Sequence, residues 1–320
     1  MSGAALKIAV LAGGVGGAKF VRGLRHAAPD ADISVVVNTG DDMWLAGVRV
    51  CPDLDSIMYA LAGVNDAERG WGRAGESERV AAELTAYGVG WPWFTLGDLD
   101  LGTHLARTSL LRDGLTLTEA TARLSARWDL GVRLLPMSDQ RVETHVRTAE
   151  GLLHFEEWWV RTRAQLPALG FEQVGVAEAR PTDAVLETLA TADVVVLAPS
   201  NPVVSIGTIL GVPGLRAALM ASPAPVVGVS PIIGGAALRG MAAECLSAIG
   251  VDVSADAVAR HYGARSGGGL LDGWLVDDAD ASVVPRLGGD GIRTVARPLY
   301  LSSLDESAAI ARAALDLARG

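Results

Sequence analysis

Four aspartates lie close together in one stretch of the chain: Asp41, Asp42, Asp53 and Asp55. The stretch begins at Asn38, directly after an apolar run (33–37) that is typical of a buried strand. In open α/β sheets, ligands bind at the carboxyl ends of the strands. Carboxylates held together repel one another unless a cation or a proton lies between them. The pattern therefore predicts a site for a divalent cation such as Mg²⁺, held together with phosphate oxygens.

The same aspartates also have a structural interpretation. Asp is favoured at helix N-termini and in turns, so Asp41 or Asp42 could cap one helix and Asp53 could begin another. We expect both interpretations to hold, with some of the four aspartates doing chemistry and the others shaping the backbone.

A glycine-rich turn precedes the acidic stretch and contains Gly13, Gly14, Gly16 and Gly17. It follows a strand-like run at 7–12 and precedes a helical pattern. Glycines there let backbone N–H groups approach a phosphate, and a helix N-terminus favours an anion. The turn lacks the G-K-[ST] ending of a Walker A loop, and Asn38 stands where NAD-binding proteins carry an acidic residue. A tight turn without a ligand is the alternative. Phosphate binding is favoured because the acidic stretch lies at the same predicted sheet edge.

Strands and helices alternate again in the second half, which predicts a Rossmann-like α/β fold with a mostly parallel sheet. Two nearly continuous apolar runs, 193–198 and 225–229, are typical of central parallel strands. Each ends in a polar turn, and together these turns would bring four residues to the ligand edge: Ser200, Asn201, Ser230 and Gly234. Turn chemistry alone could also explain them. No linker separates domains, so we predict a single domain over 1–320.

The region 56–130 is helix-rich and lacks obvious strands, which indicates an insertion or lid on the sheet. Seven of the eight tryptophans fall between Trp44 and Trp159, in or near this region. An aromatic-rich cover is suited to holding a flat ring, although most of these side chains are expected in the core.

Composition excludes several classes of protein. The charge of −10, from 27 basic and 37 acidic residues, argues against non-specific nucleic-acid binding. The two cysteines, Cys51 and Cys245, form no CxxC pattern, so a disulfide framework or a cysteine zinc site is not expected. We found neither a signal-peptide pattern nor an apolar run long enough to span a membrane. These features predict a cytoplasmic protein with small-molecule partners.

Taken together, the motifs resemble the phospholactate/phosphoenolpyruvate transferases of deazaflavin coenzyme F-420 biosynthesis. The matching segments are L-A-G-G-V-G-G-A-K, V-V-N-T-G-D-D-M-W, C-P-D-L-D-S, L-G-D-L-D-L-G-T-H-L, L-L-P-M-S-D, A-P-S-N-P-V-V-S-I-G and S-P-I-I-G. The resemblance implies a Rossmann-like core, a helical insertion and a Mg²⁺ cofactor. It also implies transfer of a phospho-three-carbon-acid unit from a guanosine diphospho donor to the ribityl hydroxyl of the deazaflavin Fo, with release of GMP.

The resemblance also implies roles for individual residues. Asp42 and Asp55 are the expected metal ligands and catalytic residues. The glycine turn, Asn38 and the later turns would bind the donor. The acceptor Fo would contact four residues: Asp55, Thr95, Asp98 and Ser138. A homodimer is possible.

The chain departs from the family pattern at two positions. Thr95 replaces a Lys and Leu99 an Arg that archaeal members often carry. The segments R-G-W-G and W-W-V-R resemble the actinobacterial branch, whose donor is thought to carry phosphoenolpyruvate.

Two other functions remain as alternatives. A nucleotide-sugar-binding regulator of a related family would usually read A-D-D-G-G-S-S-G where this chain has G-D-D-M-W-L-A-G. An NAD-dependent oxidoreductase is disfavoured by Asn38 at the ribose-reading position.

Overall fold

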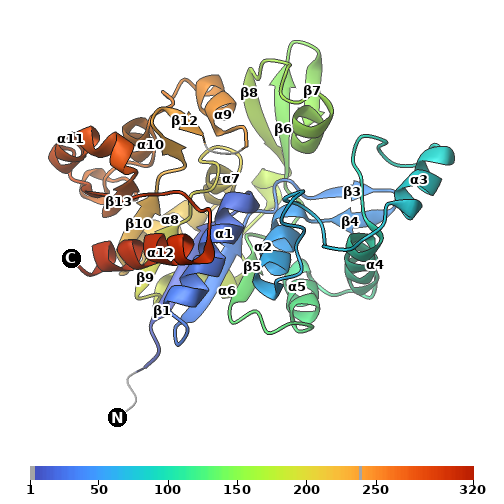
Figure 1. Ribbon diagram of the computed structural model, residues 1–320, viewed down its shortest axis with the longest axis horizontal. Helices are drawn as coiled ribbons and strands as arrows, with labels where there is room; N and C mark the ends of the chain where they lie inside the picture. Colours follow the sequence, from blue (N-terminus) through green and yellow to red (C-terminus); the bar gives the residue numbers. More distant parts are fainter. Residues whose placement is uncertain (1–3, 238–239) are drawn as a thin grey trace.

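The computed structural model describes residues 4–237 and 240–320 and is built around one parallel sheet (Figure 1). Its strands lie in the order β14 (Arg293–Ala296), β13 (Gly273–Val276), β10 (Val226–Val229), β9 (Val194–Leu197), β1 (Lys7–Ala12), β2 (Asp32–Val37) and β5 (Arg133–Pro136). All neighbouring pairs are parallel. The predicted Rossmann-like α/β fold is confirmed.

Helices cover both faces of this sheet, because consecutive strand side chains point to opposite faces. Val10 and Val35 pack into one core with α1 (Gly14–Ala27), α2 (Pro52–Ala62) and α12 (Leu304–Arg319). Leu11 and Val36 pack into the other core, whose helices are α6 (Asp183–Thr191), α7 (Ile206–Gly211), α8 (Leu215–Ala221), α9 (Ala242–Ala248), α10 (Ala255–Tyr262) and α11 (Val284–Gly289). Burial on both faces explains why the strands are almost continuously apolar.

The segment between β2 and β5 forms the insertion, and part of it projects from the sheet in Figure 1. It contains the hairpin β3 (Met43–Leu45) and β4 (Val48–Val50), then α2, α3 (Arg79–Ala86), α4 (Asp98–Arg112) and α5 (Leu117–Ser125). The predicted helices are present. The hairpin, just before the predicted 56–130 range, was missed because its three-residue strands are too short to show a period. It has a small core of its own, in which Met43, Val50 and Leu96 are buried.

A second, antiparallel sheet stands beside the end of β5. Its order is β7 (Gly151–His154), β6 (Glu143–Thr148) and β8 (Gly170–Val174). The π-helix Glu157–Arg161 follows β7. Trp158 and Phe155 pack there against Cys245 of α9, so this sheet is fixed to the main domain. A short hairpin, β11 (Ile232–Ile233) and β12 (Ala236–Ala237), completes the strands described. Of the helices in the described ranges, none has the length and apolar character needed to cross a membrane.

Gly23 sets how closely α1 approaches α12. A Cβ on Gly23 would collide with the backbone of Ser307, which lies on α12. We therefore expect Gly23→Ala to lower the free energy of unfolding by about 1–3 kcal/mol through overpacking. Gly102, exposed on α4 with open space around it, is the matched control. Gly102→Ala should raise stability by about 0.5–1 kcal/mol through helix propensity. Urea unfolding of both variants measures these changes. Equal changes in the free energy of unfolding would contradict the close approach of α1 to α12 at Gly23.

Candidate functional site

The glycine turn is locked to the turn that follows β9. The Ser200 hydroxyl accepts a hydrogen bond from the Gly13 N–H (3.0 Å) and donates one to the Gly13 carbonyl (2.7 Å). A Cβ on Gly16 would lie 2.7 Å from the Pro199 carbonyl oxygen, and one on Gly17 would lie 2.7 Å from Ser200 Oγ. Residues 199 and 200 approach this turn so closely that a side chain at Gly16 or Gly17 would collide with them. The structure thus brings the glycine turn and Ser200 together, as the sequence predicted.

Asn38 joins the acidic stretch to this turn. Its Nδ2 donates to Asp41 (3.1 Å) and to Asp53 (2.9 Å), and its Oδ1 accepts from the Gly40 N–H (2.9 Å). Asp53 in turn accepts from the Gly14 N–H at the start of α1 (2.7 Å). Asn38 therefore orients carboxylates, and Asp53 occupies the helix terminus where a phosphate would bind.

Three buried carboxylates crowd this end of the site: Asp41, Asp53 and Glu156. None of them makes an ion pair within the part of the chain that the structure describes. Burial, followed by repulsion from Asp53, raises the pKa of Glu156 to about 8. Burial raises the pKa of Asp53 to about 6 and that of Asp41 well above its ordinary value. Sequence reasoning missed Glu156, which precedes the π-helix and whose N–H donates to His154 Nδ1 (3.2 Å).

Asp42 and Asp55, the other two aspartates of the acidic stretch, each pair with an arginine. Arg49 Nη2 lies 3.2 Å from Asp42 Oδ2. Arg107 donates from both terminal nitrogens to the two oxygens of Asp55. Burial outweighs Arg49 and raises the pKa of Asp42 to about 6. Burial also raises the pKa of Asp55, although Arg107 opposes it. Sequence reasoning missed both arginines. The available signal was an arginine inside the apolar V-R-V of β4, and another three residues after His104 on a helix.

The residues present fit a hard divalent cation at this edge. Oδ1 of Asp42 and Oδ1 of Asp41 are both buried and have no hydrogen-bond partner. Mg²⁺ takes oxygen ligands and is often held by one or two carboxylates plus substrate phosphates. Asp55 can contribute only through the lone pairs that Arg107 leaves free.

Asp55, Asp100 and His104 are the one trio among the described residues whose ligand atoms converge closely enough for a metal ion. Arg107 already occupies this place, since its Nη1 lies 3.2 Å from His104 Nδ1 and 3.0 Å from Asp55 Oδ2. A guanidinium can only donate, so His104 Nδ1 accepts and Nε2 carries the proton. Asp55 and His104 therefore both accept from one arginine, and Asp100 Oδ1 lies 3.4 Å from His104 Nε2, which has no hydrogen-bond partner among the described residues.

Three predicted donor-binding residues make turn interactions instead. Asn201 Oδ1 accepts from the N–H groups of Val203 (2.9 Å) and Val204 (3.2 Å). Ser230 Oγ donates to the Ile232 carbonyl (2.8 Å). Gly234 has φ 57° and donates from its N–H to Asp280 (2.9 Å). The turn interpretation accounts for these positions, and their role in nucleotide binding stays a prediction.

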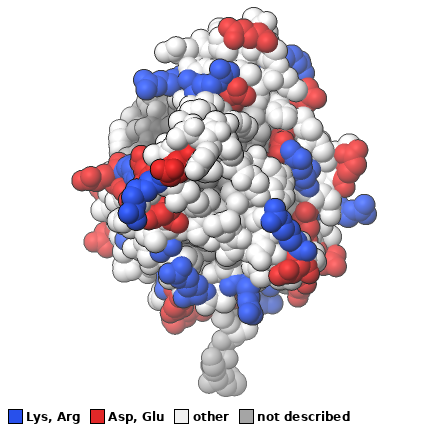
Figure 2. All heavy atoms as spheres, turned by 90° about the vertical axis from the view of Figure 1, so that its right-hand side faces the viewer, with Lys and Arg blue, Asp and Glu red and all other residues white. Residues whose placement is uncertain are grey.

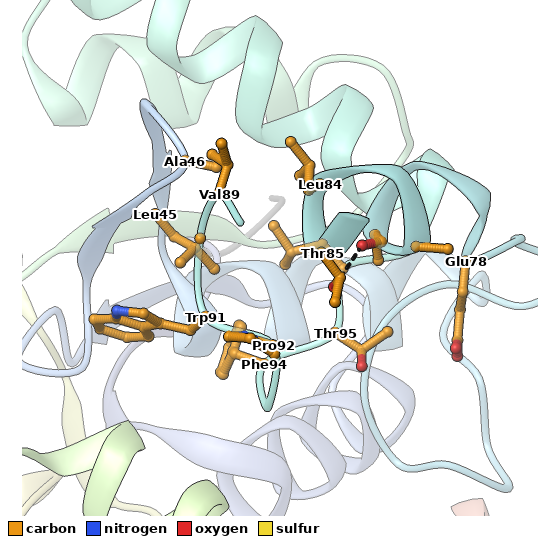
Figure 3. Close-up of a pocket in the computed structure, with 14 residues that line it drawn as sticks. Leu45, Ala46, Glu78, Leu84, Thr85, Val89, Trp91, Pro92, Phe94 and Thr95 are labelled. Atoms are coloured by element: carbon orange, nitrogen blue, oxygen red, sulfur yellow. Dashed lines mark hydrogen bonds between the residues drawn. The ribbon is translucent and has the colours of Figure 1, made fainter. Parts of the chain in front are cut away.

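Thr95 lines a cavity of about 230 Å³ between α3, the β3–β4 turn and the 88–96 loop (Figure 3). Its walls combine apolar side chains, among them Leu45, Val89, Trp91 and Phe94, with polar groups such as Glu78 and Thr85. Trp91 stacks on Trp93 with ring centroids 4.7 Å apart. An aromatic, concave site in the insertion matches the chemistry expected for a flat ring.

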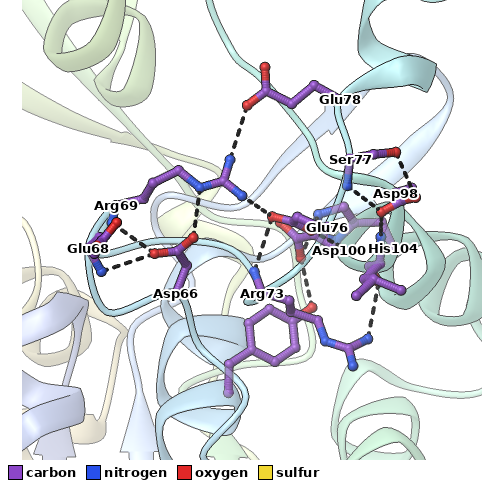
Figure 4. A network of polar contacts seen from close by, with 12 residues as sticks. Asp66, Glu68, Arg69, Arg73, Glu76, Ser77, Glu78, Asp98, Asp100 and His104 are labelled. Atoms are coloured by element: carbon purple, nitrogen blue, oxygen red, sulfur yellow. Dashed lines mark hydrogen bonds and ion pairs between the residues drawn. The ribbon is translucent and has the colours of Figure 1, made fainter.

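The other two predicted acceptor residues are engaged elsewhere. Asp98 accepts from the Ser77 N–H and hydroxyl, both at 2.9 Å, and fastens the start of α4 (Figure 4). Ser138 is buried and donates to the Arg180 carbonyl (2.8 Å). Neither lines the cavity. Their contact with an acceptor stays a prediction.

Figure 2 views the molecule from the insertion side. Acidic and basic side chains are interspersed there around a broad uncharged area. Among the described residues on this face, basic side chains alternate with acidic ones and form no extended patch.

Comparisons with known proteins agree with the motifs. The model of the 2-phospho-L-lactate transferase CofD family matches residues 8–290. Curated phosphoenolpyruvate transferases of Streptomyces griseus and Streptomyces coelicolor are 55% and 53% identical over 317 residues, 98% of each chain. That of Nocardia farcinica is 52% identical over 319 residues, covering 98% of this chain and 95% of its own. A Bacillus halodurans protein of the UPF0052 family superposes with a TM-score of 0.62 at 17% identity, covering 98% of this chain and 100% of its own, which shows the shared fold alone.

The buried Glu156 carboxylate predicts a pH-dependent stability. Its pKa in the folded chain is about 8, against an ordinary value of 4.5. Between pH 4.5 and about 8, Glu156 is therefore protonated in the folded chain and ionised in the unfolded chain. The wild-type chain thus loses stability as the pH rises through this range. Glu156→Gln stays neutral at every pH. In thermal unfolding with a chelator, we expect it to raise Tm by several degrees at pH 8 and to change it little at pH 5.

The exposed Glu150, at the β6–β7 turn, provides the control Glu150→Gln, which should leave Tm unchanged at both pH values. A Glu156→Gln variant that is less stable than wild type at pH 8 would show that the ionised carboxylate has a stabilising partner.

Proposed function

From the premise that this chain belongs to the 2-phospho-L-lactate transferase CofD family, we propose that it moves a phosphoenolpyruvyl unit from a guanosine diphospho donor to the ribityl hydroxyl of the deazaflavin Fo. The products are dehydro-coenzyme F-420-0 and GMP. The observation that supports this best is the contact between the glycine turn and the acidic stretch at one sheet edge, where Gly14 meets Asp53. The phosphoenolpyruvate transferases that match over 98% of the chain favour this three-carbon acid over 2-phospho-L-lactate.

The reaction exchanges one phosphorus–oxygen bond for another. The Fo hydroxyl oxygen forms a bond to the phosphorus that carries the three-carbon acid, and the bond from this phosphorus to the GMP oxygen breaks. Such transfers depend on in-line placement and on neutralising charge. Bound Mg²⁺ would supply positive charge to the diphosphate, with Asp42 and Asp55 as its protein ligands.

The chain's own groups have the remaining tasks. Asn38 orients Asp41 and Asp53, and Asp53 accepts from the Gly14 N–H, so these residues would lie beneath the bound diphosphate. Asp55, whose carboxylate is fixed by Arg107, would contact the acceptor Fo. One of Asp42 and Asp55 takes the proton that the Fo hydroxyl loses, and a carboxylate near its reacting atom can act as general base. The aromatic cavity beside Thr95 would receive the ring of Fo.

Charge at the two paired aspartates is required by this function. We expect Asp42→Asn or Asp55→Asn to lower turnover at least 100-fold, since each keeps the shape of the side chain and removes its charge. Mass analysis of the product formed from Fo and the guanylylated donor measures this, and circular dichroism confirms that the variants fold. Magnesium-dependent turnover at the wild-type rate in either variant would contradict the assignment. Omitting Mg²⁺ should abolish turnover of the wild-type chain as well.

Thr95→Lys tests where the ring lies. The family often carries Lys at this position, and a Lys stem can lie along the apolar cavity wall while its ammonium reaches solvent. We therefore expect Fo affinity, measured by fluorescence quenching, to stay within about threefold of wild type. Phe94→Ala, at the neighbouring cavity wall, should weaken Fo binding and leave GDP affinity unchanged. Loss of Fo binding in Thr95→Lys would show that the cavity has no room for the usual residue.

A further inference from the structure

Helix α4 buries a row of polar side chains instead of an apolar stripe. Asp100, His104, Arg107 and Thr108 are 8%, 1%, 1% and 3% exposed. Their spacing places them on one face of the helix. Burying charged groups costs desolvation energy that apolar side chains would not, so such a face is weak evidence for stability and invites a functional explanation.

Arg107 is the centre of this face. Its two terminal nitrogens donate hydrogen bonds to the two carboxylate oxygens of Asp55 on α2. The same guanidinium donates to the backbone carbonyl of Arg49 on β4 (3.3 Å), the residue whose own side chain pairs with Asp42. Thr108 Oγ1 accepts from the Arg49 N–H (2.8 Å). One helix of the insertion therefore contacts the supports of both predicted catalytic aspartates.

His104 and Asp100 hold Arg107 in its orientation. His104 accepts from Arg107 at Nδ1, and its Nε2 lies 3.4 Å from Asp100 Oδ1. Asp100 also accepts from the Tyr59 hydroxyl (2.7 Å), so its position is fixed from α2 as well. The start of α4 is anchored in turn by the buried Glu76, which accepts from the Asp100 N–H (3.1 Å) and from Arg69 (3.2 Å) (Figure 4).

We propose that Arg107 is a positioning residue for Asp55, held in register by His104 and Asp100, so that α4 forms a supporting wall of the site. This inference rests on the proposed function, in which Asp55 takes part in the transfer. Two forked hydrogen bonds define both the place and the plane of a carboxylate, which a single ammonium contact does not. A misplacement near 1 Å at a reacting group can cost roughly 100-fold in rate.

The test is a double-mutant cycle between Arg107→Lys and Asp55→Asn. Arg107→Lys keeps the positive charge and removes the bidentate hydrogen bonding of the guanidinium to Asp55. We expect its kcat to fall roughly 10- to 100-fold, with KM for the donor within about threefold of wild type. Adding Arg107→Lys to Asp55→Asn should lower kcat no further, because Arg107 acts through Asp55. Arg112→Lys, on the exposed end of the same helix, is the matched control and should retain wild-type kcat.

Two results would overturn the proposal. One is an Arg107→Lys variant whose kcat lies within twofold of wild type. The other is a double variant whose loss of kcat is the product of the two single-variant losses. If circular dichroism shows that Arg107→Lys does not fold, the same cycle is run with His104→Leu, which removes the Nδ1 acceptor. His104→Asn, whose amide oxygen can replace that acceptor, should retain more activity than His104→Leu, and equal losses would contradict the network.

A readout independent of turnover separates this inference from the proposed function. If the wild-type chain transfers nothing to Fo, the proposed function fails by itself. The ¹⁵N shifts of the His104 imidazole then decide the network: a neutral ring protonated at Nε2 supports it, and protonation at Nδ1 overturns it. Stoichiometric Mn²⁺ binding that persists in Asp42→Asn and is lost in Asp100→Asn would identify a metal centre at Asp100 and His104 and would also overturn it.

Discussion

Buried negative charge is the constraint on which this structure depends. Five carboxylates meet near the carboxyl ends of β1 and β2, where the sheet, α1 and α2 exclude water: Asp41, Asp42, Asp53, Asp55 and Glu156. An isolated ionised carboxylate in such a place is costly, so each needs a proton, a hydrogen-bond donor or a cation. The surrounding elements supply these unequally. Asp42 and Asp55 receive arginines, whereas Asp53 receives only amide N–H groups from Asn38 and Gly14.

This division explains why the insertion folds as it does. Neither arginine comes from the main sheet: Arg49 lies on β4 of the projecting hairpin and Arg107 on α4. Thr108 and Arg107 both hydrogen-bond the backbone of Arg49, so the hairpin and α4 form a unit. The insertion was predicted as a cover for a ring. The structure adds that its inner side supports the acidic site, while the cavity beside Thr95 lies between α3 and the β3–β4 turn.

Sequence reasoning located the main elements because their signals are strong. The apolar runs of β1, β2, β9 and β10 are buried on both faces, and the glycine turn needs residues without a Cβ at Gly16 and Gly17. It could not locate partners that are distant in the chain. Glu156 lies between β7 and a π-helix, and neither element has a clear periodicity in the sequence. It also grouped Asn201, Ser230 and Gly234 with the ligand edge, although each satisfies the backbone of its own turn or the loop beside it. A polar residue after a strand predicts a turn as well as it predicts a site.

The charge distribution also bears on how an anionic donor could enter. The first N–H of α1 attracts anions through the helix dipole, yet Gly14 already donates to Asp53. Asp41 and Glu156 lie close enough to repel further negative charge. A diphosphate brought to this turn alone would meet a net negative field in a low-dielectric setting, where repulsion is strong. It can bind only with added positive charge or with protons retained on the carboxylates. The free oxygens of Asp41 and Asp42 are suited to the first and the raised pKa of Glu156 to the second, so acidic residues at this sheet edge are compatible with the proposed diphosphate donor.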